Sequence, residues 1–222
     1  MPRIARVVAS GYPHHVTQRG NYRQTVFETE DDYLLYLKWL REYSKQYDIE
    51  IWAYCLMNNH VHFVCVPGKE DSLARTFNTL HMRYAQHINK RRKSNGHLWQ
   101  GRFYSAILDE AHVYTAVRYV ENNPLRAGIV KTAEDYKWSS AKEHIDGLQE
   151  GIVSGKCYLL TEISNWKSYL LEKENITMIE RIKKCSMTGR PCGDESFIGK
   201  LEEKFARQLN ALPHGRPRKK EK

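Results

Sequence analysis

The sequence lacks the features that mark membrane, secreted and disulfide-stabilised proteins. No run approaches the roughly 20 apolar residues that a membrane helix requires, and the apolar stretch near the N-terminus is too short and too interrupted for a signal peptide. The five cysteines are an odd number and include no CxxC pair, which argues against both a disulfide framework and a cysteine-type zinc site. These absences predict a cytoplasmic protein.

Acidic residues are too few to balance the basic ones. The chain has 35 Lys and Arg residues against 26 Asp and Glu residues, a net charge of +9. Such an excess favours a polyanionic partner, because binding releases counterions from phosphates, although many basic proteins never bind DNA. The charge therefore favours nucleic acid as the partner and association with the nucleoid. Two basic clusters stand out, residues 90–93 and a tail with Arg216, Arg218, Lys219, Lys220 and Lys222.

The order of strand and helix patterns predicts an α+β fold. Residues 49–57 and 60–67 are apolar runs joined by Asn58-Asn59, and asparagine tolerates the left-handed backbone of a tight turn, so we expect a β-hairpin there. The order is typical of an antiparallel sheet with helices packed on one face. The other expected elements are a strand at 12–19, helices at 29–48 and 71–93, a strand at 104–108, and a helix at 109–123.

The pattern is weaker after residue 140. Glycines between 147 and 155 indicate loops, residues 162–172 are compatible with a helix, and an amphipathic helix is expected from 194 to 209. The sequence does not show how residues 141–186 pack. The domains expected from these patterns are a core at 1–140, a mostly helical extension at 141–210 and a basic tail at 211–222.

Two histidines lie on the second strand of the expected hairpin. Side chains alternate across a strand, so His60 and His62 project from one face while Val61 points to the other. A pair of imidazoles on one face is half of a metal site. The alternative is that both are ordinary histidines on a solvent-facing sheet surface.

A tyrosine stands apart from the apolar stripe of the helix at 109–123, which is formed by valines at 113, 117 and 120. At roughly 100° per residue, Tyr119 lies off that stripe, at its edge. Asn123, four residues further on, lies nearly above it on the same helix. The alternatives are an amphipathic surface tyrosine and an asparagine that ends the helix before a proline.

These motifs, in this order, resemble the single-tyrosine HUH transposases of the IS200-like family. The similarity rests on HVH after the hairpin, a tyrosine on a later helix, and the run RYVENNPLRAGIV. Further runs, HHVTQRGN, MNNHVHFVCVP, WQGRF and TGRPCGDESF, resemble the REP-associated tyrosine transposases, which handle hairpin-forming repeats in bacterial genomes. The resemblance covers residues 12–140 densely and 187–222 more loosely. It implies a ferredoxin-like antiparallel sheet, the HUH nuclease core, with a helical C-terminal extension.

The resemblance also implies roles for individual residues. His60 and His62 match the metal-binding pair, Tyr119 matches the nucleophile, and Asn123 takes the place of the third metal ligand, where many insertion-sequence relatives have glutamine. The implied cofactor is a divalent ion, Mg²⁺ or Mn²⁺, which polarises the scissile phosphate. Attack by the tyrosine forms a covalent 5′-phosphotyrosine link and frees a 3′-hydroxyl. Rejoining then needs no ATP, in agreement with the absence of a P-loop motif.

Basic and aromatic residues elsewhere are candidates for DNA contacts. Arginines would bind phosphates or bases and aromatic rings would stack on unpaired bases, while a solvated charge or a core aromatic is the alternative for each. The tail GRPRKK resembles an AT-hook, which enters a narrow minor groove. The candidates are Arg19, Arg91, Arg92, Trp99, Arg102, Phe103, Arg126, Arg216 and Arg218.

The sequence thus predicts a site-specific single-strand DNA endonuclease and strand transferase that acts on single-stranded or hairpin DNA. Two alternatives stay open: a catalytically silent DNA-binding regulator on the same scaffold, and a metal-dependent hydrolase that activates water. Insertion-sequence relatives form dimers with shared active sites, whereas the REP-associated group resembles monomers. The long extension favours a monomer over a homodimer.

Overall fold

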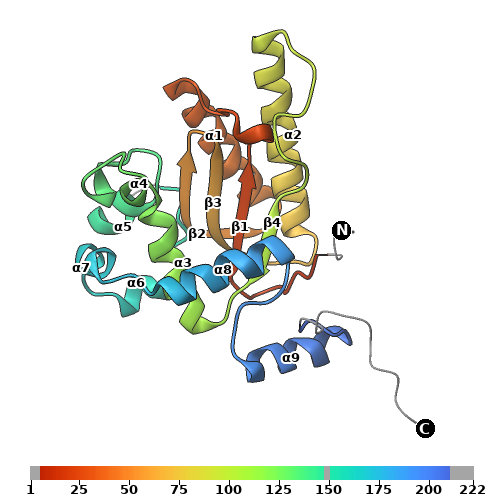
Figure 1. Ribbon diagram of the computed structural model, residues 1–222, viewed down its shortest axis with the longest axis vertical. Coiled ribbons are helices and arrows are strands. Elements are labelled where there is room, and N and C mark those ends of the chain that lie inside the picture. Colours follow the sequence, from red (N-terminus) through yellow and green to blue (C-terminus); the bar gives the residue numbers. More distant parts are fainter. Residues whose placement is uncertain (1–5, 148–150, 211–222) are drawn as a thin grey trace.

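A four-stranded antiparallel sheet forms the centre of the protein (Figure 1). The computed structural model describes residues 6–147 and 151–210. The strand order is β2-β3-β1-β4, so β3 and β1 are the inner strands. This sheet confirms the α+β class expected from the sequence. The strands are β1 (His14–Arg19), β2 (Ile49–Met57), β3 (His60–Pro67) and β4 (Tyr104–Ile107).

The hairpin between β2 and β3 turns at Asn58-Asn59, as expected, but by another conformation. Neither asparagine is among the described residues with a positive φ. Instead, their carbonyl groups hold the preceding chain segment: the Asn58 carbonyl accepts from the amides of Val26 and Phe27, and the Asn59 carbonyl accepts from that of Gly20. These hydrogen bonds tie the tip of the hairpin to the end of β1.

One face of the sheet is covered by α1 (Glu30–Gln46) and α2 (Ser72–Arg92). Phe63 of β3 is fully buried between them, with its ring 5.0 Å from that of Phe77 and 6.5 Å from that of Tyr36. Burial of each such side chain contributes about 1.5–3 kcal/mol. This is the helical layer that the sequence predicts.

The other face is covered as well, by α3 (Glu110–Glu121) and α8 (Ile176–Thr188). Figure 1 shows α8 lying across the end of the sheet in front of β1 and β4. The reason is visible in β3, where every residue after His60 is buried, so both faces of the strand need a partner. No pattern in the sequence was interpreted as α8, so this helix is a finding of the structure.

The rest of the extension consists of shorter helices. The helix expected at 162–172 is shorter than predicted and spans Trp166–Leu171, because the Asn165 side chain accepts from the Ser168 amide and caps its first turn. The helix expected to reach residue 209 ends at Phe205, where Ala206 has a φ of 46°. These helices are α5 (Ala141–Asp146), α6 (Leu159–Glu162), α7 (Trp166–Leu171) and α9 (Glu195–Phe205), while the short α4 (Asn123–Arg126) precedes the extension.

No helix in the described part of the chain is long and apolar enough to cross a membrane.

The last helix, α9, packs against the N-terminal segment and the end of β4. Ile198 and Leu201 of α9 share a small core with Val7, Ala9 and Ile107. The extension is therefore packed on the core and is not a detached appendage.

A buried polar cluster joins the extension to α3. The carboxylate of Glu121, which is fully buried, accepts hydrogen bonds from Ser140 Oγ at 2.5 Å and from Trp166 Nε1 at 2.7 Å, and it lies 2.5 Å from His144 Nδ1. Three segments distant in sequence thus meet at one carboxylate. A buried carboxylate is tolerated only when it is paired and hydrogen-bonded in this way.

We expect Glu121→Ala to lower the free energy of unfolding by about 3–5 kcal/mol, because it leaves three buried polar groups without their acceptor. Urea unfolding measures this loss. Lys142→Ala is the matched control: Lys142 lies on α5 with His144, but its ion pair with Asp146 is exposed, and we expect an unchanged urea midpoint. Equal midpoints for both variants would contradict the role of the cluster.

Candidate functional site

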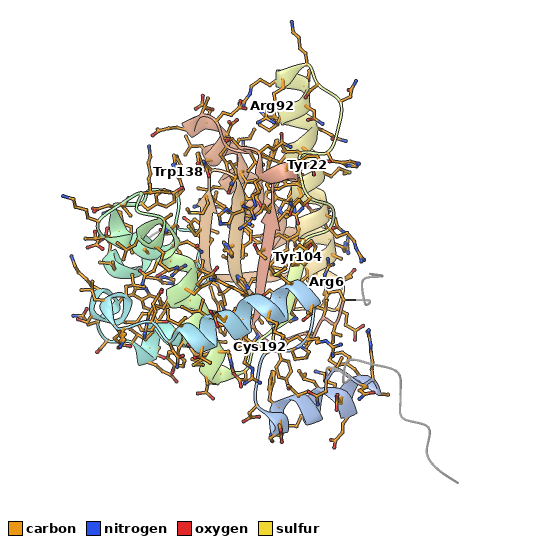
Figure 2. All side chains as sticks on the ribbon, viewed as in Figure 1. Arg6, Tyr22, Arg92, Tyr104, Trp138 and Cys192 are labelled. Atoms are coloured by element: carbon orange, nitrogen blue, oxygen red, sulfur yellow. The ribbon has the colours of Figure 1, made fainter. Side chains whose placement is uncertain are left out.

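An open cavity of about 440 Å³ lies between the sheet and the two helices α3 and α8. Both predicted metal-ligand histidines, the predicted nucleophile and the predicted third ligand line it. Tyr104 marks the cavity beside α8 in Figure 2. The lining residues are His15, Thr17, Arg19, His60, His62, Gln100, Tyr104, Tyr119, Asn123, Lys183, Ser186 and Met187.

Strand register brings the polar side chains together on one face of the sheet. Thr17 pairs with His62 and Arg19 pairs with His60 across the β1–β3 ladder. Directly opposed residues in an antiparallel pair point to the same face, about 4.5–5.5 Å apart at Cβ. The positive charge of Arg19 is therefore held next to the histidine pair.

His60 and His62 present their imidazoles side by side, as the alternation of a strand predicts. Their ring centroids are 5.0 Å apart. His60 Nδ1 lies 2.6 Å from the side-chain oxygen of Asn59, and His62 Nδ1 lies 3.0 Å from His15 Nε2. In both rings the Nδ1 atom is engaged, which leaves Nε2 as the atom that can bind a metal.

Burial keeps these imidazoles neutral. It lowers the pKa of His60 to about 4, with a smaller contribution from the positive charge of Arg19. The same cause holds the pKa of His62 well below its usual range. A histidine binds a metal ion only in its neutral form, so both rings are in the required state at neutral pH.

Tyr119 faces the histidines and not the solvent. Its ring centroid lies 5.6 Å from that of His62, nearly perpendicular to it, and only 6% of the residue is exposed. The position off the valine stripe is thus explained by the cavity, and the surface-tyrosine alternative does not apply. Burial raises the pKa of Tyr119, while the charges of Arg126 and Arg19 oppose this rise.

Two cations lie over the Tyr119 ring. The Arg126 guanidinium is 4.3 Å from the ring centroid and donates to the Tyr119 carbonyl at 2.6 Å, and Lys183 Nζ is 5.4 Å from the same centroid. Arg126 also pairs with Glu174. Positive charge at this distance stabilises a phenolate relative to the phenol.

Asn123 reaches the cavity from a different element than expected. The helix that carries Tyr119 ends at Glu121, and Asn123 is the first residue of α4, with Pro124 in its first turn. The two residues are therefore not on one continuous helix, yet both line the cavity. The Asn123 Nδ2 atom is buried and has no hydrogen-bond partner within the described ranges.

The donor set fits a divalent ion that shares its coordination with a substrate. It consists of two imidazole nitrogens and the side-chain oxygen of Asn123, while the buried, unpartnered Nδ2 of the same amide is a donor suited to a phosphate oxygen. No group of three His, Cys, Asp or Glu within residues 6–147 and 151–210 could hold a metal ion. The three ligands would leave positions for phosphate oxygens and water, as is usual for Mg²⁺ and Mn²⁺.

The predicted DNA-contact arginines are dispersed. Arg19 lines the cavity and Arg126 lies over Tyr119. Arg91 is instead bonded to Asp32 and Glu28, and Arg92 to Glu28 and Gln24. Arg92 lies at the end of α2 remote from α8 in Figure 2. Their guanidinium groups fix α2 to the first turn of α1 and to the segment before it.

The two predicted stacking residues belong to the core. Trp99 is 6% exposed and donates from Nε1 to the His81 carbonyl at 3.1 Å, and Phe103 is 3% exposed beneath the Arg6 guanidinium. This burial argues against base stacking by either ring. Arg102 is exposed and lines a separate groove, while Arg216 and Arg218 lie outside the described residues.

Sequence reasoning missed several lining residues, although signals for them exist. His15 and Thr17 alternate with Arg19 along β1, so the period of a strand places them on its face. The helix α8, which supplies Lys183, Ser186 and Met187, has a capping residue at Asn175 and a left-handed glycine at Gly189. These caps could have revealed the helix, but not where it packs.

Comparison with known proteins identifies the core. The family model of the IS200-like transposases matches residues 8–123, just over half of the chain. A curated relative from Haemophilus influenzae, named "Putative REP-associated tyrosine transposase", is 24% identical over 149 residues, which cover 59% of this chain and 85% of the relative.

A solved structure has the same fold. It is a REP-associated tyrosine transposase bound to a REP hairpin, with a TM-score of 0.57 and 18% sequence identity over 74% of this chain and 96% of that one. At this identity the likeness shows the fold alone. Together with the family match, it confirms the resemblance expected from the motifs: the chain belongs to the IS200-like transposase family.

Proposed function

We propose that the protein is a site-specific single-strand DNA endonuclease and strand transferase that works through a covalent tyrosine intermediate. One observation carries the proposal: Tyr119 lies 5.6 Å, ring to ring, from His62 in the cavity that also holds His60 and Asn123. A nucleophile and a potential metal site in one cavity are the elements that phosphoryl transfer requires.

The chemistry follows from the positions of these groups. The Tyr119 oxygen attacks the phosphorus, a tyrosine–phosphate bond forms and the bond to the 3′ oxygen breaks. The phenol proton is lost to solvent and the released 3′ oxygen takes up a proton. A divalent ion, Mg²⁺ or Mn²⁺, would neutralise charge on the scissile phosphate when bound. Attack by another 3′-hydroxyl reverses the step and joins the strand to a new end.

Positively charged residues around Tyr119 lower the free-energy cost of forming a buried phenolate. Burial of the ring favours the neutral phenol, and Arg126 and Lys183 beside the ring favour the anion. Arg19, next to His60, is placed to bind a DNA phosphate that enters the cavity. The protein thus combines an inactive resting tyrosine with cations that assist its ionisation.

The substrate that we propose is hairpin-bearing or single-stranded DNA. The solved relative is bound to a REP hairpin, and the net charge of +9 suits a phosphate backbone. A single chain supplies the histidines, the tyrosine and the amide, which favours action as a monomer. A shared-site dimer would instead need the tyrosine of one chain to reach the histidines of another.

We expect Tyr119→Phe to abolish the covalent DNA–protein adduct and to reduce cleavage by on the order of 10³-fold or more, because no other group replaces the nucleophile. The assay uses 5′-labelled and 3′-labelled hairpin DNA with Mn²⁺. The matched control is Tyr114→Phe, on the same helix but bonded to Glu162, which should retain activity. Cleavage that survives Tyr119→Phe would favour a water-activating hydrolase, and tight binding by the wild-type protein without cleavage would favour a regulator.

We expect Arg19→Gln to weaken hairpin DNA binding and to reduce the slope of log affinity against log salt by about one, the effect of one lost phosphate contact. Fluorescence anisotropy over a range of salt concentrations measures the slope. Arg75→Gln removes the same charge from an exposed site on α2, and its slope should match that of the wild-type protein. Equal slopes for all three proteins would rule out the contact.

We expect the single-turnover cleavage rate to rise between about pH 7 and about pH 9, because the phenolate fraction grows tenfold per unit below the raised pKa of Tyr119. Arg126→Gln removes a charge that lowers this pKa, so its rate should be lower at each pH and should rise to a higher pH. Arg126→Lys keeps the charge and serves as the control. A rate independent of pH in the wild-type protein would show that ionisation of Tyr119 does not limit cleavage.

A further inference from the structure

A chain of three buried polar side chains connects α8 to the candidate metal site. Ser186 Oγ of α8 lies 2.6 Å from His15 Nδ1, and His15 Nε2 lies 3.0 Å from His62 Nδ1. The exposed fractions are 1% for Ser186, 1% for His15 and 5% for His62. The chain spans 171 positions of sequence, from β1 to the extension.

The direction of the hydrogen bonds is set at the serine. A hydroxyl has one proton, and the Ile182 carbonyl, 2.8 Å away and one turn earlier in α8, can only accept, so we assign the Ser186 proton to this bond. Towards His15 the serine oxygen can therefore only accept. His15 must carry its proton on Nδ1.

The remaining proton positions follow. A neutral imidazole has one N–H, so His15 Nε2 is an acceptor, and burial disfavours the doubly protonated form. The bond to His62 must then be donated by His62 Nδ1. His62 Nε2 is left with its lone pair, which is the state that a metal ligand needs.

His60, the other proposed metal ligand, is held in the same Nδ1–H tautomer by a single hydrogen bond. The side-chain oxygen of Asn59 accepts from His60 Nδ1 at 2.6 Å, which leaves His60 Nε2 with its lone pair. His60 thus takes its orientation from its own hairpin. His62 takes it from the extension.

Packing also fixes the orientation of the His62 ring. The His15 and His62 rings stack with centroids 5.2 Å apart and an interplanar angle of 13°. On α8, Ile179 and Ile182 are buried in the main core, so the backbone of Ser186 cannot shift without repacking the helix. A well-packed helix in this position makes the orientation of His62 a fixed feature of the fold.

We propose that Ser186 is a positioning residue that acts through His15 to select the Nδ1–H tautomer of His62 and so presents Nε2 of His62 to the metal ion. The inference rests on the proposed function for the presence of that ion. Since α8 lies beyond the residues that match the family model, the extension completes the metal site of the core.

The test is Ser186→Ala, which removes the acceptor for His15. The variant should fold, because among residues 6–147 and 151–210 the serine hydroxyl bonds only to Ile182 of its own helix and to His15, and alanine is the better helix former. In metal-free, DNA-free protein, ¹⁵N chemical shifts of the ring nitrogens report the tautomer, with His62 identified by its absence in His62→Gln. We expect the wild-type protein to show His62 as the Nδ1–H form and Ser186→Ala to lose this preference.

Mn²⁺ affinity provides the second measurement. Loss of such an outer partner should weaken Mn²⁺ binding by about 10-fold or more, as measured by calorimetry. Ser186→Thr keeps a hydroxyl and should stay near wild-type affinity. Thr188→Ala is the matched control, since Thr188 on the same helix makes a similar bond to the Lys184 carbonyl but does not line the cavity.

The outcomes separate this inference from the proposed function. An unchanged His62 tautomer, or unchanged Mn²⁺ affinity, in Ser186→Ala would overturn the positioning role alone. Failure of the wild-type protein to bind Mn²⁺ would overturn the metal site of the proposed function and the positioning role with it. A change in both measurements for Ser186→Ala, and in neither for Thr188→Ala, supports the role.

Discussion

Side chains alternate along β3, and both faces of this strand are buried. Phe63 points to one face, where it fills the space between α1 and α2. His60 and His62 point to the other, where α3 and α8 cover them without filling the space completely. A shift of one residue in the β1–β3 register would exchange these faces and place two imidazoles in the apolar core. The candidate site and the hydrophobic core thus lie on opposite faces of one strand, and both depend on the same register.

The site that results is assembled largely from neutral donors. Two imidazoles kept neutral by burial and one amide carry no negative charge to attract a cation. The charged groups beside them, Arg19 and Arg126, are positive. Such a site favours a phosphate as the source of negative charge, so that a metal ion and DNA would each improve the site for the other. A site of neutral donors flanked by positive charges agrees with membership in a transposase family.

The extension contributes more than stability. Its helices meet α3 at the buried Glu121 carboxylate, and α8 closes the cavity over Tyr119 with Lys183. Elements from both parts of the chain therefore surround the same tyrosine. The core that matches the family model over residues 8–123 is thus covered by helices that follow it in the same chain.

Local periodicity was sufficient to determine part of this protein from sequence. The face shared by His60 and His62 follows from the period of a strand, and the position of Tyr119 off its valine stripe follows from the period of a helix. Both depend on neighbours a few residues away. Only the tertiary structure decided that His15 lies between Ser186 and His62, that Arg91 pairs with Asp32, and that Trp99 and Phe103 are core residues. These contacts depend on which helix packs on which face of the sheet. The packing of α8 depends on apolar surfaces far from it in sequence, and a local sequence pattern contains no information about such distant surfaces.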